Sequence, residues 1–165
     1  MNIKNQGITP HPAFLETLFA YKSQVSAVFK DVLGLNNVHH IALSTIHQQQ
    51  LLTLSSTPSL EFNLFSSPLW QFDKTYQPCW YNLCKPSPWQ SLYAPTRYNE
   101  LYYLKQAKHQ YPVGLSMAIE SMDSPIIYSL ASHNANALAE HQQEDFYKIG
   151  AYCSHALLPV LLECF

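Results

Sequence analysis

Aromatic rings and prolines are concentrated in one central segment of the chain, from Trp70 to Tyr103. Ten of the 22 aromatic residues lie there, including all three tryptophans. Four prolines interrupt the segment, namely Pro78, Pro86, Pro88 and Pro95. Because proline fixes φ and lacks a backbone N–H, the segment cannot form one regular helix or a central strand. The sequence therefore predicts an irregular, proline-fixed layer that is rich in large rings.

Such a layer is suited to form one wall of a small-molecule cavity. Tyr and Trp combine a wide apolar face with a polar tip, and ligand pockets are lined mainly by side chains of this kind. Asp73 would accept a hydrogen bond from a ligand, and Ser129 would present a hydroxyl from a facing strand. The predicted ligand-binding residues are Trp70, Asp73, Tyr76, Trp80, Tyr81, Trp89, Tyr93 and Ser129. The alternative interpretation is that these side chains form a self-satisfied aromatic core.

The composition indicates one globular domain over residues 1–165. Charged residues make up 12% of the chain, against a usual share of about 25%. The formal charge is −2 and the basic residues are scattered, which argues against nucleic-acid binding by this chain alone. The sequence has neither a run of 18 apolar residues nor a signal-peptide core at its N-terminus, so we expect a cytoplasmic protein without a membrane partner.

Hydrophobic periodicity predicts the order of the elements. The first half has a helix over 14–33 with Pro12 in its first turn, antiparallel strands over 38–47 and 51–56, and a short helix over 58–66 before the aromatic segment. The second half has a helix over 97–109, a hairpin of strands over 112–121 and 124–132 joined through Met122 and Asp123, and a long helix from residue 136 onward. The expected fold is α+β, a three-layer α-β-α sandwich around an antiparallel sheet of about five strands, similar to PAS and GAF domains. The apolar stripe of the last helix reaches the final residue, which predicts that the chain continues or that this helix pairs in a homodimer.

No motif for catalysis or cofactor binding is present. Cys79 and Cys84 have four residues between them, but no second His or Cys pair follows to complete a zinc site. The sequence lacks G-x-S-x-G, the P-loop and the dinucleotide fingerprint. We therefore expect neither an enzyme nor a bound cofactor or metal, and we interpret the four cysteines as reduced thiols. His39 and His40 would point to opposite faces of their strand, one of them buried.

The segment 111–132, YPVGLSMAIESMDSPIIYSLAS, resembles the N-terminal signal-binding domain of LuxR-type transcription regulators, as does the order of the elements. Four residues fall on the family's pattern of a glycine, a serine, a strand, a turn and a second strand, namely Gly114, Ser116, Ser129 and Ala131. Trp70, Tyr76 and Trp89 lie where the family places the aromatic residues of its cavity.

The resemblance implies a ligand-sensing regulatory domain that binds a small apolar or amphipathic molecule, forms a homodimer, and reaches DNA only through a helix-turn-helix domain that this chain lacks. Two positions depart from the family. Its Asp-Pro-Val-like step, whose carboxylate binds the ligand amide of an acyl-homoserine lactone, reads Gln-Pro-Cys-Trp at 77–80, and Met117 replaces a proline. The first departure argues against an acyl-homoserine lactone as the ligand.

Two other functions remain open at this point. The first is a protein-interaction or dimerisation module of the same fold, with a cavity filled by its own aromatic rings. The second is an enzyme that acts on a small acyl or aromatic substrate, which would need a perturbed Cys or His facing the cavity.

Overall fold

The centre of the molecule is a six-stranded sheet with the strand order β1-β3-β2-β6-β5-β4. A computed structural model describes residues 7–121 and 124–165, so the predicted link through Met122 and Asp123 lies outside the described residues. The strands are β1 (Thr9–Pro10), β2 (His40–His47), β3 (Gln50–Ser55), β4 (Ser87–Pro88), β5 (Val113–Ser121) and β6 (Ser124–Ser132). β1 runs parallel to β3, and the other neighbouring strands are antiparallel. Both predicted hairpins are confirmed, and the two-residue strands β1 and β4 form the edges.

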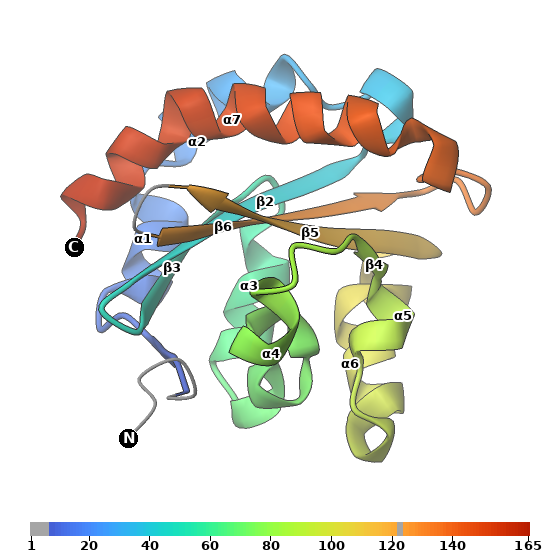
Figure 1. Cartoon of the computed structure of the whole chain (residues 1–165), viewed down its shortest axis with the longest axis horizontal. Coiled ribbons are helices and arrows are strands. Elements are labelled where there is room, and N and C mark those ends of the chain that lie inside the picture. The colour runs from blue at the N-terminus through green and yellow to red at the C-terminus, as the bar shows by residue number, and fades with distance from the viewer. Residues whose placement is uncertain (1–6, 122–123) are drawn as a thin grey trace.

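Helices cover both faces of this sheet, as the sequence predicted (Figure 1). They are α1 (Phe14–Ala20), α2 (Lys22–Lys30), α3 (Pro58–Phe65), α4 (Pro78–Tyr81), α5 (Trp89–Leu92), α6 (Tyr98–Lys105) and α7 (Gln143–Glu163). In Figure 1, α2 and α7 lie above the sheet, whereas α3 to α6 lie below it. Short 3-10 turns connect them at Leu35–Asn37, Pro68–Phe72, Lys74–Tyr76, Pro95–Arg97, Ala107–His109 and Glu140–Gln142. None of the described helices combines the length and apolar character needed to span a bilayer.

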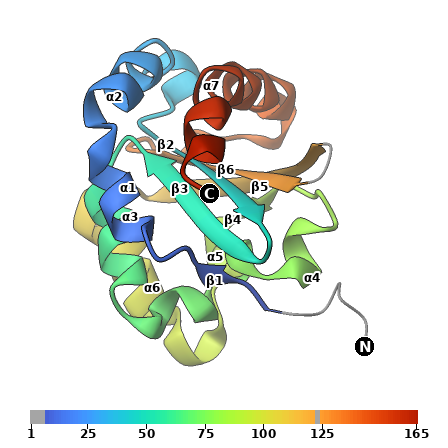
Figure 2. The ribbon, with the colours of Figure 1, turned by 90° about the vertical axis from the view of Figure 1, so that its left-hand side faces the viewer.

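The first predicted helix is in fact two helices. Tyr21, with φ −110° and ψ 26°, interrupts the helical backbone between α1 and α2, and Pro12 lies in the turn before α1 rather than inside it. α1 packs against β3 and α3, whereas α2 packs against α7. Figure 2 shows α1 beside the edge of the sheet and α2 in the layer of α7. The chain must therefore bend at Tyr21 to pass from one layer to the other.

The final helix also begins later than the periodicity predicted. α7 starts at Gln143, after a 3-10 turn, and not at residue 136. Leu138 has a positive φ of 60°, which is incompatible with a continuous right-handed helix. This irregular stretch connects the end of β6 to the start of α7, and α7 then runs back over the sheet (Figure 1).

The hairpin between β2 and β3 turns through two residues that both have positive φ, Gln48 at 50° and Gln49 at 66°. This is the backbone of a type I′ turn, whose twist matches that of the flanking strands. The two strands were predicted from the sequence, but Gln-Gln lacks the glycine that usually identifies this turn.

The two faces of the sheet carry different side chains. The register aligns large apolar residues under α2 and α7, namely Ile41, Leu43, Leu52, Leu54, Leu115, Met117, Tyr128 and Leu130. The opposite face combines the large apolar residues Ile46, Leu51 and Ile127 with eight residues that are small or carry a hydroxyl or an imidazole: His40, Ala42, Ser44, Thr53, Gly114, Ser116, Ser129 and Ala131. Small side chains leave room for the aromatic rings of the layer that contains α3 to α6.

α7 approaches the apolar face closely at Gly150. A Cβ at this position would lie 2.7 Å from Cδ2 of Tyr128, which is closer than real Cβ contacts. The tyrosine hydroxyl donates to Oγ of Ser154 one turn further along α7, at 3.3 Å. The remaining buried residues of α7 are apolar: Phe146, Ile149, Cys153, Leu157 and Leu161.

Candidate functional site

The aromatic segment is held together by a short backbone contact between its two halves. Asp73 and Tyr93 form an isolated antiparallel bridge, and the N–H of Ala94 donates to the carbonyl of Phe72 at 2.8 Å. Asp73 follows one 3-10 turn and caps the next, and Tyr93 directly follows α5. This contact places two of the predicted site residues side by side.

Asp73 forms a buried ion pair with Lys105, the last residue of α6. Nζ of Lys105 lies 2.6 Å from Oδ2 of Asp73, and the two side chains are 2% and 0% exposed. The other carboxylate oxygen accepts the N–H of Thr75 at 3.0 Å. A buried charge is tolerated only when it is paired and hydrogen-bonded. Asp73, predicted to accept a hydrogen bond from a ligand, is therefore already satisfied by a lysine that the sequence analysis missed.

Two aromatic rings surround the same ammonium group. Nζ of Lys105 lies 4.2 Å from the centre of the Trp89 ring and 5.5 Å from that of Tyr93. Trp89 lies directly against β5, where a Cβ on Gly114 would come within 2.1 Å of the indole Cδ2. Glycine is thus required at position 114 so that the indole can reach this depth.

Tyr93 is fixed at its polar end as well. Its hydroxyl donates to Oε1 of Gln106 at 2.7 Å, and Nε2 of Gln106 donates to the carbonyls of Tyr111 and Pro112, both at 3.2 Å. Burial, followed by the negative charge of Asp73, raises the pKa of Tyr93 far above its ordinary value. The phenol therefore stays neutral and acts as a donor.

A chain of hydroxyl groups links this layer to the sheet. Oγ1 of Thr75 lies 3.3 Å from Oγ of Ser116 on β5, which lies 3.2 Å from Oγ of Ser129 on β6. The prediction that Ser129 faces the aromatic layer agrees with this placement. Its hydroxyl has a partner within the protein.

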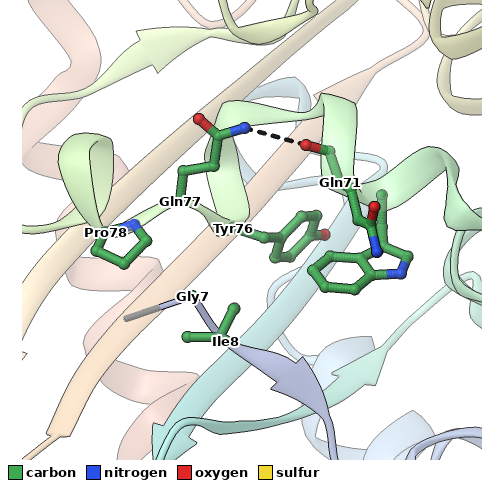
Figure 3. A pocket seen from close by; sticks show the side chains of 7 residues that line it. Gly7, Ile8, Gln71, Tyr76, Gln77 and Pro78 are labelled. Atoms are coloured by element: carbon green, nitrogen blue, oxygen red, sulfur yellow. Dashed lines mark hydrogen bonds between the residues drawn. The ribbon is translucent and has the colours of Figure 1, made fainter. Parts of the chain in front are cut away.

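An open pocket lies between the aromatic segment and the residues that precede β1 (Figure 3). Its volume is about 250 Å³, and it is lined by Gly7, Ile8, Trp70, Gln71, Tyr76, Gln77 and Pro78. Phe65 supports both of its aromatic walls, with ring centres 5.5 Å from Trp70 and 4.9 Å from Tyr76. Nε2 of Gln77 donates to the carbonyl of Gln71 at 3.1 Å, as Figure 3 shows. Burial, followed by the charges of Asp73 and Glu61, raises the pKa of Tyr76.

The eight predicted residues thus fall into three groups. Trp70 and Tyr76 line the open pocket, whereas Trp80 and Tyr81 are buried on α4. The indole N–H of Trp80 donates to Oγ of Ser87 at 2.9 Å, which ties α4 to β4, and burial raises the pKa of Tyr81 to about 12. The interior group around the ion pair and the hydroxyl chain consists of Asp73, Trp89, Tyr93 and Ser129.

A second buried polar cluster lies at the start of β2. Nε2 of His40 is 3.4 Å from Oε1 of Glu61 on α3, with the side chains 0% and 2% exposed. The imidazole of His40 lies edge-on to Trp89, with ring centres 5.9 Å apart. Oε2 of Glu61 and the indole N–H of Trp89 have no hydrogen-bond partner among the described residues. The sequence analysis expected that one histidine of the His39–His40 pair is buried. No motif or spacing in the sequence identified Glu61 on α3 as its partner.

The described residues contain neither a disulfide bond nor a cluster of metal ligands. All four cysteines are free, and Cys79 is exposed whereas Cys153 is buried on the inner face of α7. Burial raises the pKa of the Cys153 thiol to about 12. Residues 7–121 and 124–165 contain no group of three or more His, Cys, Asp or Glu side chains placed to hold a metal ion.

Comparisons with family models and with curated proteins found no match. Solved structures do match. The crystal structure of SdiA from Escherichia coli aligns with a TM-score of 0.57 and 11% identity over 89% of this chain and 67% of that one. The chain has the fold of a LuxR-type signal-binding domain. The solution structure of SdiA 1–171 gives a TM-score of 0.57 and 12% identity, over 87% of this chain and 84% of that one.

A third match is CepR2 from Burkholderia cenocepacia, an N-acylhomoserine lactone dependent LuxR family transcription factor. Its TM-score is 0.56 at 12% identity, over 88% of this chain and 91% of that one. The fold that the sequence resemblance implied is thereby confirmed. At this identity the likeness concerns the fold, and the ligand has to be argued from the residues of this chain.

Proposed function

We propose that this chain is a ligand-sensing regulatory domain of a LuxR-like transcription regulator and that it binds a small apolar or amphipathic molecule. The observation that carries the proposal is the open pocket, in which Trp70 and Tyr76 form the aromatic walls. The fold shared with SdiA and CepR2 supports it, because those proteins are regulators rather than enzymes.

The volume of the pocket limits the size of the ligand. About 250 Å³ lies just below the range of roughly 300–1,000 Å³ that is common for small-molecule sites. A compact molecule, or one end of a longer chain, would fill it. Gln77 would offer the ligand a neutral carboxamide where the LuxR-type regulators carry an acid, which disfavours an acyl-homoserine lactone.

Binding would act on the layer that contains α3 to α6. Asp73 lies between the pocket residues Trp70 and Tyr76 in sequence, and it contacts α6 through Lys105. A ligand shifts a conformational equilibrium only by the difference in its affinity for the two states. We propose that it biases the packing of the interior group of Asp73, Trp89, Tyr93 and Ser129, together with Trp80 and Tyr81 on α4.

The proposed assembly is a homodimer with a DNA-binding domain outside residues 1–165. A cytoplasmic homodimer would pass the change to a separate helix-turn-helix domain, which is the part that would bind DNA. The outer face of α7, where Tyr152 and Leu162 are exposed, is the proposed dimer surface.

The first test is native mass spectrometry of the purified protein before and after mild organic extraction, followed by thermal denaturation with a panel of fatty acids, acyl-homoserine lactones and indole. We expect a bound molecule that is lost on extraction, with a lower Tm for the extracted protein. Trp70→Ala should weaken binding of the responsive compound about tenfold or more, because the ring buries apolar surface against it. Tyr103→Ala, which removes an exposed ring of α6, is the matched control and should bind normally. Normal binding by Trp70→Ala would overturn the assignment of the pocket.

A second candidate function is a protein-interaction module that needs no ligand. The observation that favours it is the side chain of Lys105, which fills the interior between Asp73, Trp89 and Tyr93. A protein that carries no bound molecule and shows no Tm change with any member of the panel would support this second function over the first.

A further inference from the structure

The ammonium of Lys105 has the surroundings that proteins use to bind an organic cation. A carboxylate oxygen of Asp73 lies 2.6 Å away, and the rings of Trp89 and Tyr93 lie at 4.2 and 5.5 Å. Cations are attracted to the faces of aromatic rings within about 6 Å, most strongly to Trp, and the attraction increases when water is excluded. A charged hydrogen bond to a carboxylate completes the recognition of an ammonium group.

The walls of this cage are positioned by contacts in which the lysine side chain takes no part. The bridge between Asp73 and Tyr93 is formed by the backbone, and Thr75 fixes the second oxygen of Asp73. The indole of Trp89 rests on Gly114 of the sheet. The hydroxyl of Tyr93 is held by the carboxamide of Gln106. The cage is therefore a preformed site, and the lysine is its occupant.

We propose that Asp73, Trp89 and Tyr93 form an ammonium-binding cage, and that Lys105 occupies it as a ligand tethered to the same chain. The molecules that this cage would take are primary ammonium ions on a short, unbranched alkyl chain. The buried layer below the sheet is thus filled by the protein itself, whatever binds at Trp70 and Tyr76. The inference does not depend on the proposed ligand of the open pocket.

The cage can be emptied and refilled. Lys105→Ala removes Cγ, Cδ, Cε and Nζ, which n-propylammonium would replace atom for atom. We expect the variant to lose roughly 6–20 °C in Tm, because Asp73 is left buried without its counter-charge. Millimolar n-propylammonium chloride should restore much of this loss in a concentration-dependent way, since a molecule that binds only the folded state raises Tm.

Three controls separate recognition of the charge from simple filling of space. n-Propanol has the same size without the charge, and sodium chloride supplies ionic strength alone, so neither should restore the Tm of Lys105→Ala. Lys108→Ala, in the 3-10 turn that follows α6, removes an exposed lysine and should show neither the loss nor the response to the amine. Asp73→Asn in the Lys105→Ala background should abolish the preference for the amine over the alcohol. Equal rescue by n-propanol, or no rescue of a folded variant, would overturn the proposal.

A measurement on the unmodified protein keeps the test independent of how the variant folds. In NMR spectra, the ε-methylene protons of Lys105 should be shifted upfield by the ring of Trp89, and its NH₃⁺ protons should exchange slowly because they are buried. Random-coil shifts with fast exchange would contradict the occupied cage. The ligand panel used for the open pocket involves neither the amine nor these signals, so a negative result there leaves this test intact.

Discussion

The two faces of the sheet are both covered by helices, but different interactions hold the two coverings in place. On one face, α7 presents apolar side chains to large apolar residues of the strands, with Gly150 allowing close approach to Tyr128. On the other face, the strands present small or hydroxyl-bearing residues beside the large apolar Ile46, Leu51 and Ile127. The covering layer there contributes a buried ion pair and the buried amide of Gln106. One face resembles an ordinary apolar core. On the other face, polar side chains are buried and paired with one another.

This difference shows how the molecule divides stability from specificity. Apolar burial is non-directional and tolerates small shifts, whereas a buried polar group costs free energy unless its partner stands in the correct place. The apolar face is therefore expected to stabilise the fold. The polar face permits one arrangement of Asp73, Lys105 and Gln106. We therefore expect a bound ligand to change the packing of this face before that of the apolar face.

The largest expected effect comes from breaking the ion pair on the polar face. Asp73→Leu leaves Lys105 charged and buried without a partner, and we expect a loss of about 3–5 kcal/mol in the free energy of unfolding. The double variant Asp73→Leu/Lys105→Met replaces both partners by apolar groups and should regain most of that loss. Urea denaturation of the three proteins measures both steps. If the single and double variants were equally unstable, the pair would not be the cause.

On the apolar face, a comparable loss should arise from a cavity alone. Leu157→Ala removes a buried side chain of α7 and should cost about 2–5 kcal/mol in the free energy of unfolding. Because its neighbours are apolar, no second substitution of opposite charge should rescue it. Urea denaturation gives the cost, and the ring-current shift of Lys105 should remain unchanged. A change in that shift would mean that the two faces are coupled.

A smaller effect is expected from acid, and it belongs to the polar face. Burial, then the neighbouring His40 and Lys108, lowers the pKa of His109, so the unfolded chain binds a proton at a higher pH than the folded protein does. Stability from this residue is complete above the unfolded pKa of about 6.5 and is lost as the pH falls toward the folded value. His109→Gln should therefore flatten the decline of Tm between pH 7 and pH 5. An unchanged slope would assign the decline to other groups.

The smallest effect concerns thiol reactivity and leaves stability unchanged. Burial on the inner face of α7 raises the pKa of Cys153 to about 12, so its thiolate is scarce at neutral pH, whereas Cys79 is exposed. A thiol reagent such as DTNB should modify Cys79 quickly and Cys153 only after unfolding. The variants Cys79→Ser and Cys153→Ala would show which phase of the reaction belongs to which cysteine. Fast modification of Cys153 in the folded protein would show that the apolar face opens readily.

Local sequence patterns predicted most of the fold because periodicity and turn residues act over a few positions. Both hairpins, the short helix α3 and the helical layers on the two faces of the sheet follow from such patterns. The break at Tyr21 was missed because the apolar spacing of residues 14–33 is continuous across it, and only packing against two different layers divides the helix. The late start of α7 was missed for a related reason, since Leu138 fits the helical period although its backbone is left-handed.

The candidate site was predicted as six aromatic residues with Asp73 and Ser129, without the central cation of Lys105. The sequence places Lys105 on an amphipathic helix, and lysine is rarely buried unless it is paired. Its partner Asp73 lies 32 residues away, so no local spacing connects them.

The sequence by itself determined that this chain folds as an α-β-α sandwich with an irregular aromatic layer, because proline positions and hydrophobic periods restrict each segment separately. Only the tertiary structure decided which polar groups meet inside that layer. The ammonium of Lys105 lies between Asp73, Trp89 and Tyr93 because a backbone bridge, a glycine of the sheet and the end of α6 converge there. A buried charge must find its partner in space, and that partner is chosen by how distant segments pack.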